Sequence, residues 1–347
     1  MKFGPVPVRD SLGHIVAHAV RQVDLVLKKG QIVEAHHIER LIAGGVSEII
    51  VAALEPGDLG EDAAALRLAE AVAGEHVRVE TPFTGRSNLH AQANGVLVID
   101  VDIVDRINAI DESVTLATLP AFRTIVDGEM IATVKIIPFA VRGAVLAAAL
   151  GVAHKPPLRV APFLPLRIGV ISTLLPGLKP SVIEKTLRIL DTRLAPAGAR
   201  VVAEMRVPHE AQALSQAIHA IEADCDLIVV FGASAITDRR DVIPSAVEKA
   251  GGTIEHFGMP VDPGNLLLLA RLSDGRPILG APGCARSPKE NGFDWVLHRL
   301  LAGLPVTGAD IRRMGVGGLL MEIVSRPQPR AGSQAEVEVS DHAHVDD

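Results

Sequence analysis

The sequence is poor in aromatic residues, and this shortage restricts the partners that the protein can have. Aromatic side chains make up 3% of its 347 residues; tyrosine is absent and there is one tryptophan. Proteins that bind single-stranded nucleic acid stack bases on aromatic rings, and those that bind duplexes need a basic surface. This chain has 34 basic and 41 acidic residues, a formal net charge of −7. We therefore expect no nucleic-acid partner.

Cysteines and long apolar runs are also scarce. The two cysteines, Cys225 and Cys284, are too few for a disulfide framework or a zinc cluster. Charged residues or prolines interrupt every apolar run before the roughly 20 residues that a transmembrane helix needs. Residues 1–7 contain no apolar stretch like that of a signal peptide. The sequence thus predicts a soluble, cytoplasmic protein with no membrane partner.

Aliphatic side chains must fill the interior, because 48% of the residues are hydrophobic and few of these are aromatic. Such a composition is common in α/β proteins, whose parallel strands are buried on both faces. Over residues 167–325, β-branched runs alternate with amphipathic runs, which predicts a doubly wound, mostly parallel sheet with helices on both faces. The expected strands are 168–172, 199–205, 226–231, 266–272 and 277–280, and the expected helices are 181–194, 208–221, 243–250 and 289–301.

The rest of the chain is predicted to form three further parts. Residues 1–151 mix short helical and β-branched runs and predict an N-terminal α+β accessory region. Residues 152–166 contain four prolines, which suit neither a helix nor a central strand, and predict a linker. Residues 326–347 combine proline, glycine, serine, histidine and acidic residues with little apolar content, and predict a disordered tail.

The loop 232–241 is the first candidate site, because it follows the most apolar of the predicted strands. Ligands of open parallel sheets bind beyond the carboxyl ends of the strands, where small residues let the backbone approach an anion. Carboxylates in the loop are suited to Mg²⁺, hydroxyls to a polar ligand and guanidiniums to phosphate. The candidates are Gly232, Ala233, Ser234, Thr237, Asp238, Arg239, Arg240 and Asp241. Helix capping and solvated Asp–Arg pairs explain the same residues almost as well.

The loop 280–288 is the second candidate site. It combines small residues, the start of a helix and a single arginine in Pro282, Gly283, Cys284, Arg286 and Ser287. On spacing alone, a tight strand-to-helix turn explains it better than a ligand does. Two such loops after neighbouring strands of one sheet would converge, however, which favours a joint site.

Cysteine and histidine offer few further candidates. Cys284 is either an acidified thiolate near a helix N-terminus or a small apolar filler, and the filler role is favoured. The pairs His36–His37 and His209–His219 do not have the spacing of metal ligands, so these side chains are expected at the surface.

Both loops resemble the signature of a known family. Residues 232–244 are similar to the Gly-Gly-Thr-Gly…Arg-Asp-Val-Thr-Pro signature of molybdopterin-binding domains of the MoaB/Mog and MoeA type. Residues 282–285, Pro-Gly-Cys-Ala, resemble the Leu-Pro-Gly-Asn-Pro loop of that family, and residues 259–264 resemble the Pro-Gly-Lys-Pro stretch before it. The similarity covers about residues 167–320. It implies a MoaB/Mog-like fold for this part of the chain.

The N-terminal part also resembles MoeA-like proteins, in residues 8–19 and 27–46. Residues 76–150 carry a weaker resemblance. The whole chain looks most like the molybdopterin-binding half of bacterial proteins in which it is fused to a molybdenum cofactor nucleotidyltransferase.

The resemblance implies a ligand and roles for the loop residues. The ligand is molybdopterin, a pterin with a dithiolene and a terminal phosphate, with Mg²⁺ and ATP as further cofactors. Asp241 matches the family aspartate that helps to bind Mg²⁺ and nucleotide phosphates, and Asp238 is a second catalytic candidate. The backbone amides of residues 232–234 match those that hold the phosphate. Phosphoryl-type transfer needs mainly positioning and charge neutralisation, which such a loop and a nearby arginine supply.

Departures from the family pattern leave two functions open. Where acidic residues are common in the family, this chain has Thr173 followed by Leu174, and His209 after Pro208. One function is an enzyme of molybdenum cofactor biosynthesis that transfers an adenylyl group to the pterin phosphate or inserts molybdate. The alternative is a non-catalytic carrier that presents molybdopterin to a nucleotidyltransferase or an apoenzyme. A weaker third possibility is a Mog-like fold that acts on another nucleotide or pterin. Family members form dimers or trimers, so a homo-oligomer is expected.

Overall fold

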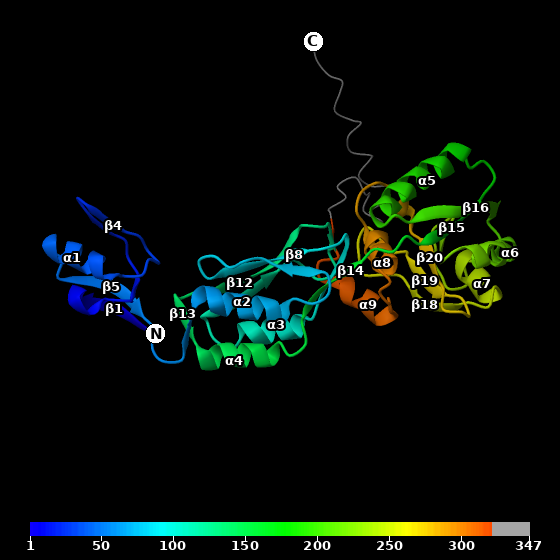
Figure 1. Ribbon diagram of the computed structural model, residues 1–347. Coiled ribbons are helices and arrows are strands. Elements are labelled where there is room, and N and C mark those ends of the chain that lie inside the picture. Colours follow the sequence, from blue (N-terminus) through cyan, green and yellow to red (C-terminus); the bar gives the residue numbers. More distant parts are fainter. Residues whose placement is uncertain (321–347) are drawn as a thin grey trace, which may run out of the picture. The chain divides into compact units, whose positions relative to one another are not determined.

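The computed structural model describes residues 1–320, which divide into two compact units (Figure 1). The first unit comprises Met1–Leu166 with Thr192–Arg200 and Leu297–Pro305, and the second comprises the remaining described residues. No helix in this part of the chain has the length and hydrophobicity needed to cross a bilayer. The tail predicted at residues 326–347 lies outside the described residues.

Residues 1–53 form a small β-sheet with one helix. The sheet has the order β1-β5-β2, with β5 antiparallel to both neighbours. The elements are β1 (Lys2–Pro7), β2 (Ile15–Val16), the hairpin β3 (Val20–Gln22) and β4 (Leu25–Leu27), α1 (Ala35–Ala43) and β5 (Glu48–Ala53). His37 is 5% exposed, so its predicted surface position is wrong. Its Nδ1 accepts a hydrogen bond from the Glu34 amide at 3.0 Å, which draws the ring back over the start of α1.

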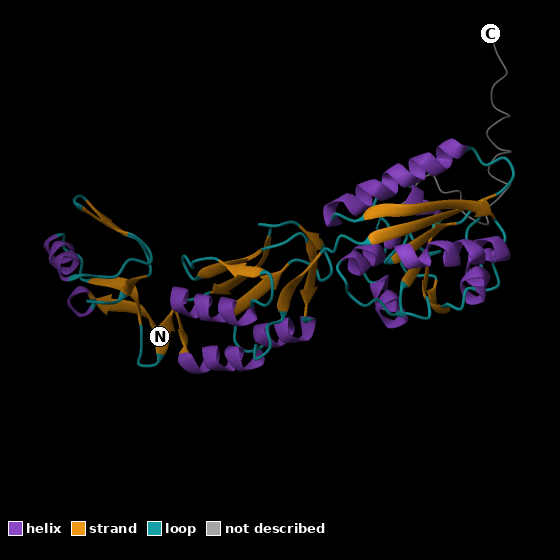
Figure 2. Ribbon diagram, turned by 45° about the vertical axis from the view of Figure 1, so that its right-hand side comes forward, coloured by secondary structure: helices purple, strands orange, loops and turns teal. Residues whose placement is uncertain are grey.

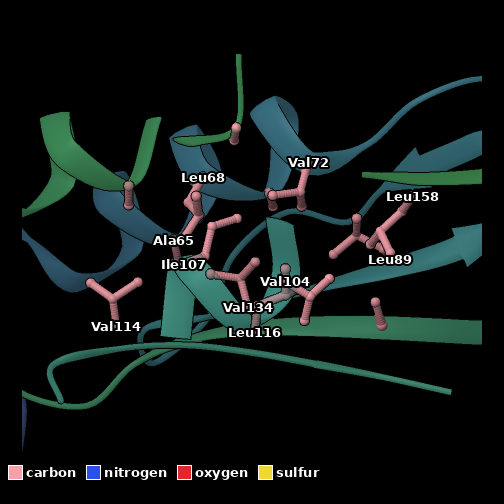
Figure 3. Close-up of a cluster of buried hydrophobic side chains, with 14 of the residues drawn as sticks. Ala65, Leu68, Val72, Leu89, Val104, Ile107, Val114, Leu116, Val134 and Leu158 are labelled. Atoms are coloured by element: carbon pink, nitrogen blue, oxygen red, sulfur yellow. The ribbon is translucent and has the colours of Figure 1, made fainter. Parts of the chain in front are cut away.

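The middle of the chain packs three helices against antiparallel strands. The helices are α2 (Glu61–Val72), α3 (Val101–Asn108) and α4 (Gly143–Val152). Strand order is β10-β12-β8-β7 in one sheet, β11-β9-β14 in a second, where β14 comprises Leu158–Pro162, and β13-β6 in a third. Bounds are β6 (Asp58–Gly60), β7 (Val77–Val79), β8 (Arg86–Ala91), β9 (Gly95–Ile99), β10 (Val114–Thr118), β11 (Thr124–Ile125), β12 (Met130–Ile136) and β13 (Ala140–Arg142). Leu68, Ile107, Val134 and Leu158 lie in the buried core between them (Figure 3).

Two features of this region differ from the sequence-based expectation. Helices α3 and α4 were not predicted. α3 has its buried residues at helical spacing but only eight residues, which is short for a helix to be recognised, and α4 is apolar all round and so has no helical period. Residues 158–162, within the predicted linker, form strand β14 (Leu158–Pro162), which pairs with β9. β14 is an edge strand of its sheet, the position in which a proline without a backbone N–H is tolerated.

The second unit is built on a six-stranded sheet with the order β16-β15-β17-β20-β19-β18. Neighbours β15, β17 and β20 run parallel, whereas β19 and β18 continue the sheet in antiparallel pairs. The bounds are β15 (Arg167–Leu174), β16 (Arg200–Pro208), β17 (Leu227–Phe231), β18 (Thr253–Phe257), β19 (Leu268–Arg271) and β20 (Pro277–Ala281). Pro208 was expected in the first turn of a helix, but it is the last residue of strand β16. The predicted α/β class with a parallel sheet core is confirmed.

Helices cover both faces of this sheet (Figure 2). Ile171, Ile228 and Val230 point to one face and share a core with α6 (Ala211–Ile221) and α7 (Val242–Lys249). On the opposite face, the ring of Phe231 lies 6.5 Å from that of Phe293, in the helix formed by Gly292–Leu301. The remaining helices are α5 (Pro180–Leu194), α8 (Gly292–Leu301) and α9 (Gly308–Arg312).

Candidate functional site

The two candidate loops leave the sheet side by side. They follow β17 and β20, which are adjacent and parallel, and Phe231 is the register partner of Ala281 at the ends of these strands. The carboxyl ends of parallel strands share one edge of a sheet, the usual ligand-binding edge of this architecture. Ser234 and Cys284 therefore lie in loops at the same edge, as the predicted joint site requires.

Arg286 connects the two loops directly. Its Nη2 donates a hydrogen bond to the carbonyl oxygen of Gly232 at 3.0 Å, and its Nη1 donates one to Oγ1 of Thr186 in α5 at 2.9 Å. Its guanidinium carbon lies 5.3 Å from the centre of the Phe231 ring. These contacts hold the planar guanidinium at the carboxyl edge of the sheet.

The charge of Arg286 has no carboxylate partner among the described residues. Its hydrogen-bond acceptors are a hydroxyl and a backbone carbonyl, and burial lowers the pKa of the guanidinium from its usual value. A guanidinium has five N–H bonds, so two protein hydrogen bonds leave three donors available. A half-buried cation without a counter-ion is a favourable place for an anionic group of a ligand.

The carboxylates of the first loop are engaged in local structure. Asp241 caps α7: its Oδ1 accepts from the Val242 amide at 2.7 Å and its Oδ2 from the Thr237 amide at 3.2 Å. Asp238 pairs with Arg240, whose Nε lies 2.7 Å from its Oδ1. Hydrogen bonds from the Arg240 side chain and amide lower the pKa of Asp238 to about 2. The helix-capping role that the sequence offered for this loop is therefore confirmed for Asp241.

The other predicted residues of this loop differ in accessibility. Ser234, Thr237 and Arg239 are exposed, and Gly232 and Ala233 are half-buried. The amide of Ala233, one of those expected to hold phosphate, already donates to Oγ1 of Thr173 at 2.8 Å. It is therefore a poorer donor for a ligand than the sequence suggested.

The second loop is a short 3₁₀ turn, Gly283–Arg286, that follows β20. Pro282 is buried, Gly283 is exposed, and Cys284 and Ser287 are half-buried. A Cβ atom added to Gly283 would meet nothing within 4 Å, so this backbone has open space beside it. The Ser287 hydroxyl accepts from the Lys289 amide at 3.3 Å.

A third stretch reaches the same edge of the sheet. Phe257, at the end of β18, is the register partner of Leu268, which in turn pairs with Gly280 near the end of β20. Residues 258–267 between β18 and β19 therefore lie at the carboxyl end of β20. The amide of Gly292 in α8 donates to the carbonyl oxygen of Pro263 at 2.8 Å, which fixes this stretch beside the second loop.

With this geometry in place, comparison with known families identifies the domain. Residues 169–302, which contain both loops, match the family described as "Probable molybdopterin binding domain". The matched residues make up less than half of the 347-residue chain. The match supports the prediction that the chain acts in molybdenum cofactor biosynthesis through molybdopterin binding. Residues 5–53 match a domain of unknown function, and no curated protein matches the sequence.

Several solved structures show a distant likeness. A molybdopterin biosynthesis MoeA protein from Pyrococcus horikoshii is 14% identical, with 87% of this chain and 75% of that chain covered and a TM-score of 0.31. The molybdopterin biosynthesis enzyme MoaB from Thermus thermophilus is 16% identical, with 40% and 98% covered and a TM-score of 0.28. A molybdenum cofactor biosynthesis protein from Pyrococcus furiosus is 11% identical, with 87% and 64% covered and a TM-score of 0.26. At this level of likeness no residue role is transferred.

The molybdopterin-binding domain also contains polar residues that sequence reasoning did not place in the site. Oγ1 of Thr173, at the end of β15, lies 2.8 Å from Nδ1 of His209, which directly follows β16. His209 is half-buried, so it is less exposed than a surface residue was expected to be. Ser172 is 1% exposed and its hydroxyl has no hydrogen-bond partner in the described structure. The available signal was a run of hydroxyl residues at the end of an otherwise apolar strand.

The donor set of the molybdopterin-binding domain does not fit Mg²⁺. A small, hard cation needs several oxygen ligands in tight geometry. Both oxygens of Asp241 accept backbone hydrogen bonds, and Asp238 is paired with Arg240. Within residues 1–320, no group of three or more His, Cys, Asp and Glu side chains is arranged to hold a metal ion.

Proposed function

We propose that the molybdopterin-binding domain is a cofactor carrier, which holds molybdopterin at the carboxyl edge of the sheet and passes it on without transforming it. The single observation that carries this proposal is the half-buried Arg286, which joins both loops and has no carboxylate partner among the described residues. A phosphate placed there would gain charge-assisted hydrogen bonds from the remaining N–H donors of Arg286.

The carrier is favoured over the enzyme because adenylyl transfer requires more than binding. A transferring phosphoryl group needs dense charge neutralisation, which metal-bound carboxylates commonly provide. The carboxylates of the first loop are engaged in a helix cap and an exposed ion pair. Molybdopterin would leave this site for a nucleotidyltransferase or an apoenzyme, the partner class that completes the proposal.

The test uses the full-length protein with molybdopterin under anaerobic conditions, with and without Mg²⁺ and ATP. A carrier binds molybdopterin, which pterin fluorescence reports, and releases no pyrophosphate above the protein-free background. Release of pyrophosphate that Asp241→Ala abolishes and Asp241→Asn reduces would establish the enzyme instead. If molybdopterin does not bind under any of these conditions, neither function stands.

A further inference from the structure

The carboxyl edge of the sheet in the molybdopterin-binding domain presents a hydroxyl and an imidazole where a metal site would need carboxylates. Thr173 and His209 come from the ends of neighbouring strands, β15 and β16, and their Oγ1 and Nδ1 atoms lie 2.8 Å apart. Thr173 Oγ1 also accepts from the Ala233 amide, so the pair fastens the first loop to the sheet. A hydroxyl and an imidazole nitrogen that bond to each other in this way are poor ligands for Mg²⁺.

The positive charge at this edge comes from the side chain of Arg286 and not from a bound metal ion. Arg286 donates hydrogen bonds to the Thr186 hydroxyl and the Gly232 carbonyl, and its guanidinium lies over the ring of Phe231. This fixed orientation removes most of the entropic cost of binding an anion with a long, mobile side chain.

An independent observation points to a polar ligand on the same face of the sheet. The hydroxyl of Ser172 is buried and has no hydrogen-bond partner in the described structure. Ser172 is the register partner of Phe231, so the two side chains stand on the same face of neighbouring strands, and Arg286 lies over Phe231. A buried hydroxyl without a partner is costly, and a bound oxygen atom would remove that cost.

We propose that this site binds the phosphate of its ligand without a divalent cation, with the guanidinium of Arg286 in place of the metal. The inference rests on the proposed molybdopterin binding and adds the nature of the counter-charge. In a metal-dependent site, by contrast, carboxylates would bind Mg²⁺ and the Mg²⁺ would bind the phosphate.

The first experiment measures the affinity of the full-length protein for molybdopterin in EDTA and in millimolar Mg²⁺. We expect the two dissociation constants to agree within about twofold, because no donor set gathers the cation. Affinity should fall as salt is raised, since the attraction between guanidinium and phosphate is screened. Binding that appears only with Mg²⁺ would overturn the inference and leave the proposed function intact, whereas no binding in either buffer would overturn both.

Variants of Arg286 test the counter-charge. Arg286→Gln should weaken molybdopterin binding at least about tenfold, the scale of one charge-assisted hydrogen bond. Arg286→Lys should lose less, because the positive charge remains. Arg313→Gln is the matched control, an exposed arginine of the same unit, and should bind as the wild type does. Equal affinity of Arg286→Gln and wild type would refute the inference.

A second variant keeps the inference testable if Arg286→Gln does not fold. Thr173→Asp with His209→Asp puts two carboxylates at the ends of β15 and β16. We expect this double variant to bind molybdopterin at least about fivefold more tightly with Mg²⁺ than with EDTA, because two carboxylates now share the cation. If the wild type also binds more tightly with Mg²⁺, to the same extent as the double variant, the cation and not Arg286 supplies the counter-charge and the inference fails.

Discussion

Arg286 Nη2 donates to the carbonyl oxygen of Gly232 at 3.0 Å, across 54 positions of the sequence. This bond and the one to Thr186 are made by a planar guanidinium, whose fork reaches two acceptors at once. Arg286→Lys keeps the charge but not this geometry. We expect the free energy of unfolding to fall by about 1–3 kcal/mol, the usual cost of losing hydrogen bonds of a half-buried charged group.

Chemical denaturation measures this effect, with Arg240→Lys as the control. Arg240 is in the first loop, and its side chain is 90% exposed and paired only with Asp238. Its replacement should change stability by less than about 0.5 kcal/mol, as is usual for exposed ion pairs. Equal effects of the two substitutions would show that Arg286 does not stabilise the contact between the loops.

Gly232 is required by close packing at the start of the first loop. A Cβ atom at this position would lie 2.6 Å from the carbonyl oxygen of Ser234 and 2.9 Å from Cδ1 of Ile243. Gly232→Ala should therefore displace the loop, lower the free energy of unfolding by about 1–3 kcal/mol and weaken ligand binding. Thermal unfolding and molybdopterin titration check both effects.

Gly283→Ala is the matched control in the second loop, where an added Cβ meets nothing within 4 Å. Its stability should stay within about 0.5 kcal/mol of the wild type. A loss of binding without a loss of stability would show that the ligand occupies the open space beside Gly283. If Gly232→Ala is as stable as the wild type, the loop can shift to make room for the added Cβ atom, and the prediction that close packing requires glycine here is wrong.

Thr173 anchors the first loop through its hydroxyl. Thr173→Val keeps the shape of the side chain but removes the acceptor of the Ala233 amide and the partner of His209. We expect a loss of about 1–3 kcal/mol, because an amide in a half-buried loop is left without its hydrogen bond. Thr173→Ser keeps the hydroxyl and should recover most of that stability. Hydrogen exchange at Ala233 is the direct readout: the amide should exchange faster in the valine variant and as in the wild type in the serine variant.

The ion pair of Arg167 and Asp226 should make stability depend on pH. Hydrogen bonds from the Arg167 side chain and amide hold the pKa of Asp226 below its usual value. A carboxylate whose pKa is lower in the folded state stabilises the fold above the unfolded-state pKa of about 3.9. This contribution is lost as the pH falls through the lower folded-state pKa.

Asp226→Asn should therefore be less stable than the wild type at pH 7, and the difference should shrink once the pH falls below about 4. Denaturation curves at pH 7, 4 and 2.5 measure the difference. A gap of constant size over this range would mean that the charge of Asp226 contributes nothing, and that the substitution acts through packing alone.

Part of the site was predictable because local chemistry determines it. Residues 227–231 are an uncharged apolar run, and they form the buried strand β17 that leads into the first loop. The small residues Gly232 and Gly283 were recognised because a close approach of backbone to ligand needs them. Asp241 was recognised as a possible cap or metal ligand, and the sequence could not choose between these roles, since both use the same carboxylate.

The contact between Thr173 and His209 could not be predicted in the same way. The two residues are 36 positions apart, and their contact exists only because β15 and β16 are neighbours in the sheet. The same holds for Arg286 and Thr186, which are 100 positions apart. A sequence shows which groups are present, but not which carboxylates are engaged or which cation lacks a partner.

The sequence by itself determined the alternation of strands and helices, the small residues of the loops and the similarity to molybdopterin-binding domains, because periodicity and local spacing are written along the chain. Only the tertiary structure decided that both loops share one edge, that Asp241 caps α7 and that Arg286 is the uncompensated charge. These properties depend on strand order and burial, which bring distant residues together and set the cost of every unpaired polar group.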